Sequence, residues 1–228
     1  MLLKRKENNK KIKNNKNKKF NIKGSQLIIV GSLLILGGLS LVGGKYFYNY
    51  LQNREEDNKL QDFYEVQEQI DNTDEEITNN EDKLQEEKKE ISVSNEEYIA
   101  VIKIPKIGLE KGLYKKGSYN NNVNKNIQIL NDSSYPDEDN GNFILAGHSG
   151  NGRVAYFKNL HKLEREDQVS VFYNGSEYRY KVVNMYDIEK TGSANIIRNA
   201  NKSTLTLVTC RHNTNKQIII ICELVEKV

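Results

Sequence analysis

One stretch limits what this chain can fold into more than any other: residues 24–44 contain no charged side chain. Within it, residues 27–42 are nearly all Leu, Ile, Val and Gly. About 20 apolar residues are enough to cross a bilayer as a helix, so the stretch predicts a transmembrane anchor. A cleaved signal peptide is the alternative, but the Gly-Gly-Lys-Tyr-Phe sequence at residues 43–47 is a poor cleavage site.

The charges around this stretch predict its orientation. Residues 1–23 carry ten Lys or Arg against a single acid, Glu7, whereas Lys45 is the only charge close behind the apolar run. Basic residues stay on the cytoplasmic side, so residues 1–23 are expected to form a cytoplasmic tail and the rest to lie outside the cell. Because the basic tail is explained by a membrane, we expect no nucleic-acid partner. Aromatic residues follow at the expected outer interface: Tyr46, Phe47, Tyr48 and Tyr50.

Residues 45–97 are expected to form an acidic extracellular stalk. Residues 51–98 carry seventeen acids against five bases, with no Pro or Gly. Five apolar residues recur every seventh position, but the companion positions are polar, so only half of a coiled-coil seam is present. We therefore expect a solvated, partly helical spacer that lays at most one thin stripe on a partner surface. The five are Phe63, Ile70, Ile77, Leu84 and Ile91.

From residue 98 onward the pattern changes to short strands. Strands are expected at 98–104, 109–114, 142–146, 168–173, 178–187, 204–210 and 218–224, with a helical turn at 157–163. Asn174 and Gly175 form a hairpin signal, because Asn-Gly readily adopts the left-handed turn conformation. Many short strands with little helix predict a mainly β domain, a barrel or sandwich, over residues 98–228.

Two residues at the ends of predicted strands could carry chemistry. His148 follows an apolar strand and is bounded by Gly147 and Gly150, whereas Cys210 ends a second strand. A Cys next to a His can form a thiolate–imidazolium pair, the activated nucleophile of cysteine enzymes. The residues alone leave open a structural His and an inert buried Cys.

Four motifs, in one order over residues 98–224, resemble those of sortases. They are Ile-Lys-Ile-Pro-Lys-Ile-Gly at 102–108, Gly-Asn-Phe-Ile-Leu-Ala-Gly-His at 141–148, Phe-Lys-Asn-Leu at 157–160 and Thr-Leu-Val-Thr-Cys at 206–210. The resemblance implies an eight-stranded β-barrel on a Gram-positive membrane. It also implies a cysteine transpeptidase, of the thiol protease class, that cleaves an LPXTG-like signal through a thioacyl-enzyme and joins the protein to a cell-wall amine. The sequence shows no Asp-Pro lid motif in its N-terminal region and no second C-terminal anchor, which favours a housekeeping or small specialised type over a pilin-polymerising one.

The same resemblance assigns roles to individual residues. Cys210 would be the nucleophile, His148 would protonate the leaving amine and deprotonate the incoming one, and Thr209 would help to form the substrate site. The family also uses an Arg that stabilises the oxyanion. Here the best register puts Lys216 at that position, with Gln217 one residue away and Arg211 as the alternative cation.

The remaining candidates have more ordinary interpretations. His161 is expected on the surface, and His212 is a minor alternative base because it lies two residues from Cys210. Cys222, within an apolar run, is expected in the core, with a disulfide to Cys210 left open. No cofactor is expected: acidic residues before the His strand lack the ordered spacing of a Ca²⁺ site, so a solvated loop is favoured. These residues are Asp132, Asp137, Glu138 and Asp139.

Three rival functions remain open at this point. The first is a catalytically weak or silent domain that binds a sorting signal without cleaving it. The second is a cysteine peptidase that uses water as the acceptor. The third is a membrane-tethered structural protein, for which Cys210 would not matter.

Overall fold

The computed structural model describes residues 24–77 and 97–228. The predicted cytoplasmic tail (1–23) and most of the second half of the predicted stalk, with Leu84 and Ile91, lie outside the described residues. The chain divides into two compact units, Met1–Gln52 and Asn53–Val228. Each unit is described by itself below.

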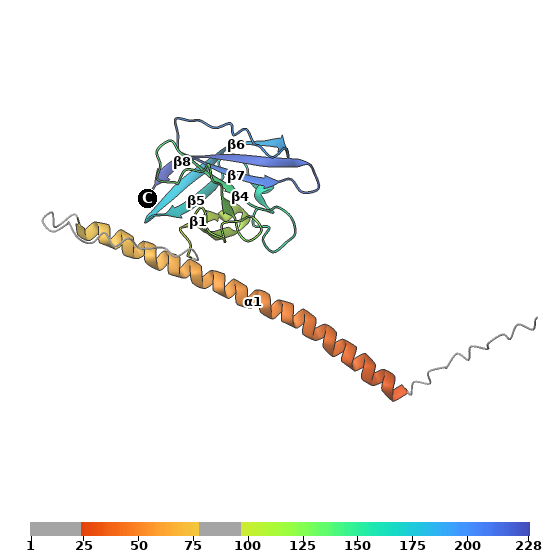
Figure 1. Cartoon of the computed structure of the whole chain (residues 1–228). Helices are drawn as coiled ribbons and strands as arrows, with labels where there is room; N and C mark the ends of the chain where they lie inside the picture. The colour runs from red at the N-terminus through yellow and green to blue at the C-terminus, as the bar shows by residue number, and fades with distance from the viewer. Residues whose placement is uncertain (1–23, 78–96) are drawn as a thin grey trace, which may run out of the picture. The chain divides into compact units, whose positions relative to one another are not determined.

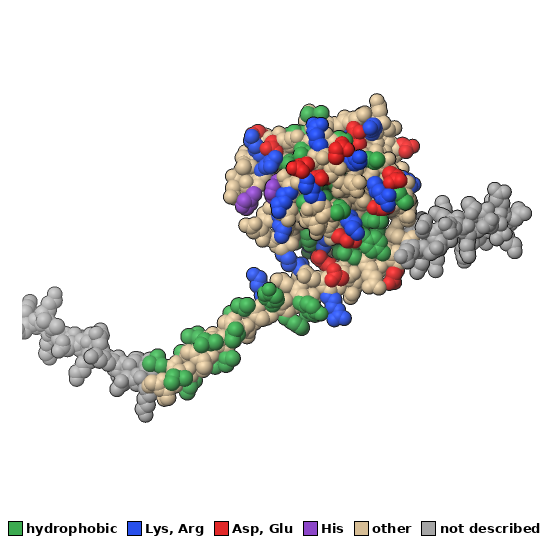
Figure 2. Space-filling model, turned by 180° about the vertical axis from the view of Figure 1, so that it is seen from behind, with side chains coloured by type: hydrophobic (Ala, Val, Ile, Leu, Met, Phe, Trp, Pro, Cys, Tyr) green, Lys and Arg blue, Asp and Glu red, His purple; other side chains and the backbone are tan. Residues whose placement is uncertain are grey.

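A single long helix, α1 (Gly24–Ile77), runs through the described part of the N-terminal region. Its first half carries large apolar side chains that are mostly exposed, among them Leu34 at 72% and Leu41 at 78%. They line the green part of the helix in Figure 2. The segment Leu27–Gln67 is long and apolar enough to cross a membrane. This finding agrees with the expected anchor, and an apolar stretch exposed on all sides needs a non-aqueous partner.

The part of α1 within the second unit packs against strands and is not a free spacer there. Phe63 is only 5% exposed and joins a small apolar cluster with Tyr98, Val101 and Tyr114. The neighbouring Tyr64 contacts the ring of Phe172 edge-on at 5.5 Å between centroids. The apolar stripe expected from the sequence is therefore used, at least by Phe63, to seat the helix on the β domain.

An ion pair adds to the packing of α1 against the β domain. The ammonium of Lys111 is 2.8 Å from a carboxylate oxygen of Glu56 on α1 and 4.5 Å from the centre of the Tyr156 ring. Lys111 is 5% exposed, and its burial lowers the pKa of its ammonium group. A buried cation needs a partner, so Glu56 is the residue that makes the burial of Lys111 tolerable.

Eight strands form the β domain. Figure 1 shows how the labelled strands wrap around a common core. The eight strands are β1 (Ala100–Ile104), β2 (Leu109–Leu113), β3 (Gln128–Ile129), β4 (Asn142–Ala146), β5 (Gln168–Tyr173), β6 (Ser176–Glu189), β7 (Thr204–Cys210) and β8 (Lys216–Lys227). Two 3₁₀ turns, η1 (Pro105–Ile107) and η2 (Leu160–Lys162), accompany them. The strand order β2-β1-β5-β6-β8-β7-β4-β3 gives a nearly closed barrel, so the expected eight-stranded fold is confirmed.

The barrel interior is an apolar core to which nearly every strand contributes, including Ile102, Phe143, Val171 and Leu207. The pairing is antiparallel throughout the described sheet except between β4 and β7, which run parallel. Parallel neighbours present their carboxyl ends at the same edge. The residues that follow β4 and those that end β7 therefore meet.

A second apolar cluster covers the outside of the sheet at β4, β7 and β8. Its buried members are Ile144, Val208, Ile219 and Ile221, which alternate with side chains of the barrel core. We call this cluster the outer apolar face. Because successive side chains of a strand point to opposite faces, it also defines which neighbouring residues share that side of the sheet.

Candidate active site

The carboxyl ends of β4 and β7 bring two of the predicted site residues to the same place. The parallel register pairs Ala146 with Val208, and the next backbone bond runs from the N–H of Gly147 to the carbonyl of Val208 at 3.1 Å. Two residues further along each chain are His148 and Cys210. Cys210 ends β7, and alternation along that strand puts its side chain on the outer apolar face with Val208. His148 lies in the turn that follows β4, at the same edge of the sheet.

Two contacts lock the backbone beneath His148. The hydroxyl of Thr209, only 4% exposed, donates to the carbonyl of Gly147 at 2.6 Å. A Cβ on Gly147 would lie 2.9 Å from the Phe157 ring, and the N–H of Phe157 donates to the carbonyl of His148 at 3.0 Å. The motifs that the sequence separates thus converge on one turn. Thr209 is expected to help form the substrate site. In the structure its hydroxyl bonds the backbone of the turn that carries His148.

The imidazole of His148 has a partner that sequence reasoning missed. Its Nε2 is 3.2 Å from Oδ1 of Asn124, which belongs to the loop between β2 and β3. An amide oxygen accepts a hydrogen bond, so this contact favours the tautomer with the proton on Nε2. Nδ1 has no hydrogen-bond partner among the described residues. No sequence signal singles out Asn124, because it is one of several Asn in that loop.

The two thiols differ sharply in their surroundings. Cys210 is partly exposed, whereas Cys222 is completely buried opposite Leu205 in the barrel, and both are free. Burial raises the pKa of the Cys222 thiol well above its usual range. The thiolate is the nucleophilic form of cysteine, so Cys222 is inert and Cys210 is the thiol available for chemistry.

On the other side of Cys210, the register with β8 places Gln217 directly across. The N–H of Arg211 donates to the carbonyl of Lys216 at 2.8 Å, so these two residues form the next pair toward the loop. Lys216 is exposed and alternates with Gln217, which puts it on the face opposite Cys210. Arg211 is held by Asp187, with 2.8 Å from its Nε to the carboxylate. Neither cation shares the face of Cys210.

The loop between β6 and β7 forms a wall beside the outer apolar face. The Tyr186 hydroxyl donates to the carbonyl of Asn195 at 3.0 Å and accepts from the N–H of Ile197 at 2.8 Å. Ile196, between these two residues, packs against the outer apolar face. The Tyr186 hydroxyl thus fixes the backbone around Ile196, which helps to cover the outer apolar face next to the strand that ends at Cys210.

The other candidates make no described contact with Cys210 or His148. His161 is exposed on η2, with its Nδ1 3.1 Å from the carbonyl of Lys158, and His212 is exposed in the loop after β7. Figure 2 shows histidine side chains in purple at one margin of the barrel, beside blue Lys and Arg side chains. In the acidic loop, Glu138 accepts from the N–H of Tyr135. Across residues 24–77 and 97–228, no cluster of three or more His, Cys, Asp or Glu is arranged to hold a metal.

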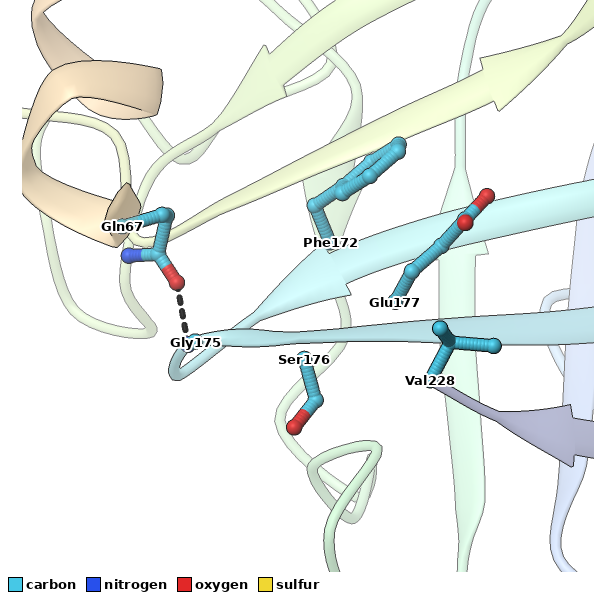
Figure 3. Close-up of a pocket in the computed structure, with 6 residues that line it drawn as sticks. All are labelled: Gln67, Phe172, Gly175, Ser176, Glu177 and Val228. Atoms are coloured by element: carbon cyan, nitrogen blue, oxygen red, sulfur yellow. Dashed lines mark hydrogen bonds between the residues drawn. The ribbon is translucent and has the colours of Figure 1, made fainter. Parts of the chain in front are cut away.

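A shallow pocket elsewhere in the second unit shares no residue with the Cys210 region. It lies at the turn between β5 and β6, where the N–H of Gly175 donates to the side-chain oxygen of Gln67, as Figure 3 shows. Phe172 and Glu177 also line it. No Cys or His is among its lining residues, and its one carboxylate, Glu177, is paired with Arg179 at 2.7 Å.

A partly exposed Cys thus ends β7, and a His follows the neighbouring β4 at the same rim of the barrel. The sortase domain family model matches residues 102–225, more than half of the chain. The chain belongs to the sortase family. Among curated relatives, sortase D of Bacillus subtilis (strain 168) is 31% identical over 110 residues, covering 48% of this chain and 52% of the relative. Sortase A of Bacillus anthracis is 23% identical over 136 residues, covering 56% and 60%.

The chain thus spans between half and two thirds of the length of these two relatives. Among solved structures, a sortase D5 transpeptidase of Clostridium perfringens matches with a TM-score of 0.55 at 23% identity, covering 75% of this chain and 98% of that one. At this identity the likeness concerns the fold. It agrees with the barrel described above.

Proposed function

We propose that this protein is a membrane-anchored cysteine transpeptidase that cleaves an LPXTG-like sorting signal and joins the released protein to a cell-wall amine. One observation carries the proposal: in a chain of the sortase family, the parallel pairing of β4 and β7 ends at one edge of the barrel, directly before the segments that carry His148 and Cys210. The supporting facts are the partial exposure of Cys210 and, within the described residues, the absence of a hydrogen-bond partner for Nδ1 of His148.

The first half of the reaction is acylation. The Cys210 thiolate attacks the carbonyl carbon of the Thr–Gly bond in the signal, which places a negative charge on the carbonyl oxygen. His148, as imidazolium, gives its proton to the leaving glycine nitrogen, the C–N bond breaks, and a thioester to Cys210 remains.

The second half transfers the acyl group. His148, now neutral, takes a proton from the incoming amine as its nitrogen attacks the thioester carbon. The C–S bond breaks and the electron pair returns to the Cys210 sulfur, which restores the thiolate. A new amide bond replaces the one that was cut, so the exchange needs no outside energy source.

The N-terminal region supports a placement at the cell surface. The candidate span within α1 follows a tail with ten basic residues, which favours an N-terminus inside and a catalytic domain outside. The partners would be secreted proteins with a C-terminal sorting signal and a peptidoglycan precursor with a free amine. We also propose a housekeeping or small specialised type, with no metal or cofactor.

The test uses the full chain in detergent micelles with a panel of fluorogenic sorting peptides, with and without an amine acceptor. We expect one peptide class to be cleaved, a conjugate to form when the amine is present, and mass spectrometry to find the acyl group on Cys210. Cys210→Ala should abolish all three signals, whereas Cys222→Ala, which changes only the buried thiol, should retain them.

The rival functions give different results in the same assay. Peptide binding without cleavage by the unmodified chain would support a silent binding domain. Cleavage that yields only the free acid, even with a large excess of amine, would support a hydrolytic peptidase. Retained cleavage in Cys210→Ala would refute the thiol mechanism altogether.

A further inference from the structure

Gln217 faces Cys210 across the β7–β8 pair, on the side away from His148. The register pairs Cys210 with Gln217, and the hydrogen bond between Arg211 and Lys216 marks the neighbouring pair as the hydrogen-bonded kind. Pairs alternate along an antiparallel ladder, so Cys210 and Gln217 form a non-hydrogen-bonded pair, in which the side chains approach most closely.

The same alternation places Gln217 on the outer apolar face. Val208 is paired with Ile219, two residues before Cys210 and two after Gln217, and both of these apolar side chains belong to that face. On its other side Gln217 is paired with Ile188 of β6, which also packs against this face. Cys210 and Gln217 therefore lie side by side on this face across β7 and β8, and β4, which precedes His148, is the neighbour of β7 on its other side.

The Gln217 side chain is half-buried and forms no side-chain hydrogen bond with the described part of the chain. Its amide carries two N–H donors on a flexible stem of two methylenes. A half-buried donor without a protein partner, next to a nucleophile, is free to bind an acceptor that arrives with the substrate. The charge produced by thiolate attack is such an acceptor.

The nearby cations are less suited to this role. Arg211 is engaged by Asp187 at 2.8 Å, on the side of the sheet away from Cys210. Lys216 shares that side and is paired with Glu189 of β6. A shift of one residue exchanges the two faces of a strand, so Lys216 cannot reach the thiol without breaking the β7–β8 register.

We propose that the Gln217 side-chain amide donates the hydrogen bond that stabilises the oxyanion formed when Cys210 attacks the substrate carbonyl. The proposal rests on the proposed transpeptidase function and names a further catalytic residue for it. A neutral amide provides a directed hydrogen bond without a full charge. It therefore stabilises the transition state while leaving the ionisation of Cys210 to its other neighbours.

The experiment measures two rates on the full chain in detergent micelles. The first is the single-turnover rate at which a cleaved sorting peptide acylates Cys210. The second is the alkylation rate of Cys210 by iodoacetamide, a reaction with no oxyanion. In Gln217→Ala and in Gln217→Met, which keeps the size of the side chain, we expect acylation to fall roughly 100- to 1,000-fold. Alkylation should stay within about threefold of the parent.

Matched variants sharpen the comparison. Gln168→Ala removes an exposed Gln of β5 and should leave both rates within about threefold. Lys216→Ala should reduce acylation far less than Gln217→Ala, and Gln217→Glu, which keeps the shape but loses the donor, should be at least as slow as Gln217→Met. Circular dichroism confirms that each variant keeps the fold.

Three outcomes would overturn the assignment: acylation in Gln217→Met within about threefold of the parent, a parallel loss of alkylation, or a larger loss in Lys216→Ala. These results are distinct from failure of the proposed function. If the proposed function is wrong, the unmodified chain either forms no acyl-enzyme with any peptide or releases only the free acid when an amine acceptor is present. If only the Gln217 assignment is wrong, the unmodified chain and Gln217→Met both form it.

Discussion

The ion pair between Glu56 and Lys111 predicts a large difference between two adjacent glutamates of α1. Glu56→Gln removes the carboxylate that lies 2.8 Å from the buried Lys111 ammonium. Glu55→Gln, its matched control, removes a carboxylate that is 3.3 Å from Lys59 on the exposed helix surface. The two substitutions are chemically identical, but the Lys111 side chain is 6% exposed against 30% for Lys59. Glu56 also accepts a hydrogen bond from the Tyr156 hydroxyl at 3.3 Å.

The magnitude follows from that burial. Breaking a buried ion pair costs roughly 3–5 kcal/mol, because the remaining charge is uncompensated. The Glu56 side chain is 34% exposed, so water can partly replace it, and the loss in unfolding free energy should be about 2–3 kcal/mol. An exposed helical pair contributes about 0.3–0.5 kcal/mol, which is the loss expected for Glu55→Gln.

The assay is denaturant unfolding of the full chain in micelles, followed by circular dichroism because the chain has no Trp. The pH dependence gives a second readout. Burial lowers the pKa of Lys111 below its ordinary 10.5, so the folded state releases this proton at a lower pH than the unfolded state does. The loss of unfolding free energy caused by Glu56→Gln should therefore shrink as the pH rises toward 10.5, because Lys111 then loses its charge in the folded state. Equal losses in the two variants, or a deficit that grows with pH, would refute the reasoning.

Three further predictions concern the site. Thr209→Val removes the hydroxyl bonded to Gly147 and should cost about 1–3 kcal/mol of unfolding free energy; it should also lower kcat more than it raises KM, and unchanged kinetics would contradict a positioning role. Gly147→Ala crowds Phe157 and should cost roughly 1–3 kcal/mol, with partial rescue by Phe157→Leu; a loss that Phe157→Leu leaves intact would point to another cause. Ellman's reagent should label Cys210 in the folded chain and Cys222 only after unfolding, and two fast thiols in the native protein would contradict the buried position.

Much of the barrel could be predicted from the sequence because its strands carry strong local signals. The expected bounds of β4, β5 and β7 match the structure to the residue. The predicted turn at Asn174 and Gly175 has positive φ at both positions, 50° and 77°, as a tight hairpin between β5 and β6 requires.

The strand β3 could not be predicted, and its pairing shows why. It has only two residues, too short for any alternation to be detected. Its second residue, Ile129, is bonded on both sides by the amide of Asn121, which accepts from its N–H at 2.7 Å and donates to its carbonyl at 2.9 Å. The Asn121 side chain makes the hydrogen bonds that a neighbouring strand would otherwise make, and this arrangement leaves no periodic pattern in the sequence.

At the candidate site, His148 and Cys210 could be named from motifs, and their roles remain predictions. The residue opposite the thiol could not be fixed, because the loop at 211–215 can close in more than one register. A shift of one residue in the β7–β8 register would place Lys216 in the position of Gln217 and would move each side chain of β8 to the other face of the sheet. Only the pairing of whole strands decides between them.

The parallel pairing of β4 and β7 also has a consequence for how the protein matures. The two strands are separated by more than fifty residues, and β7 must enter between β4 and β8, the last strand to be synthesised. Long-range pairings of this kind form slowly, after loop closure has been achieved. The edge at which Cys210 and the segment after β4 meet therefore exists only once the barrel is complete, and until then a nascent chain carries the Cys210 thiol without the surroundings proposed for catalysis.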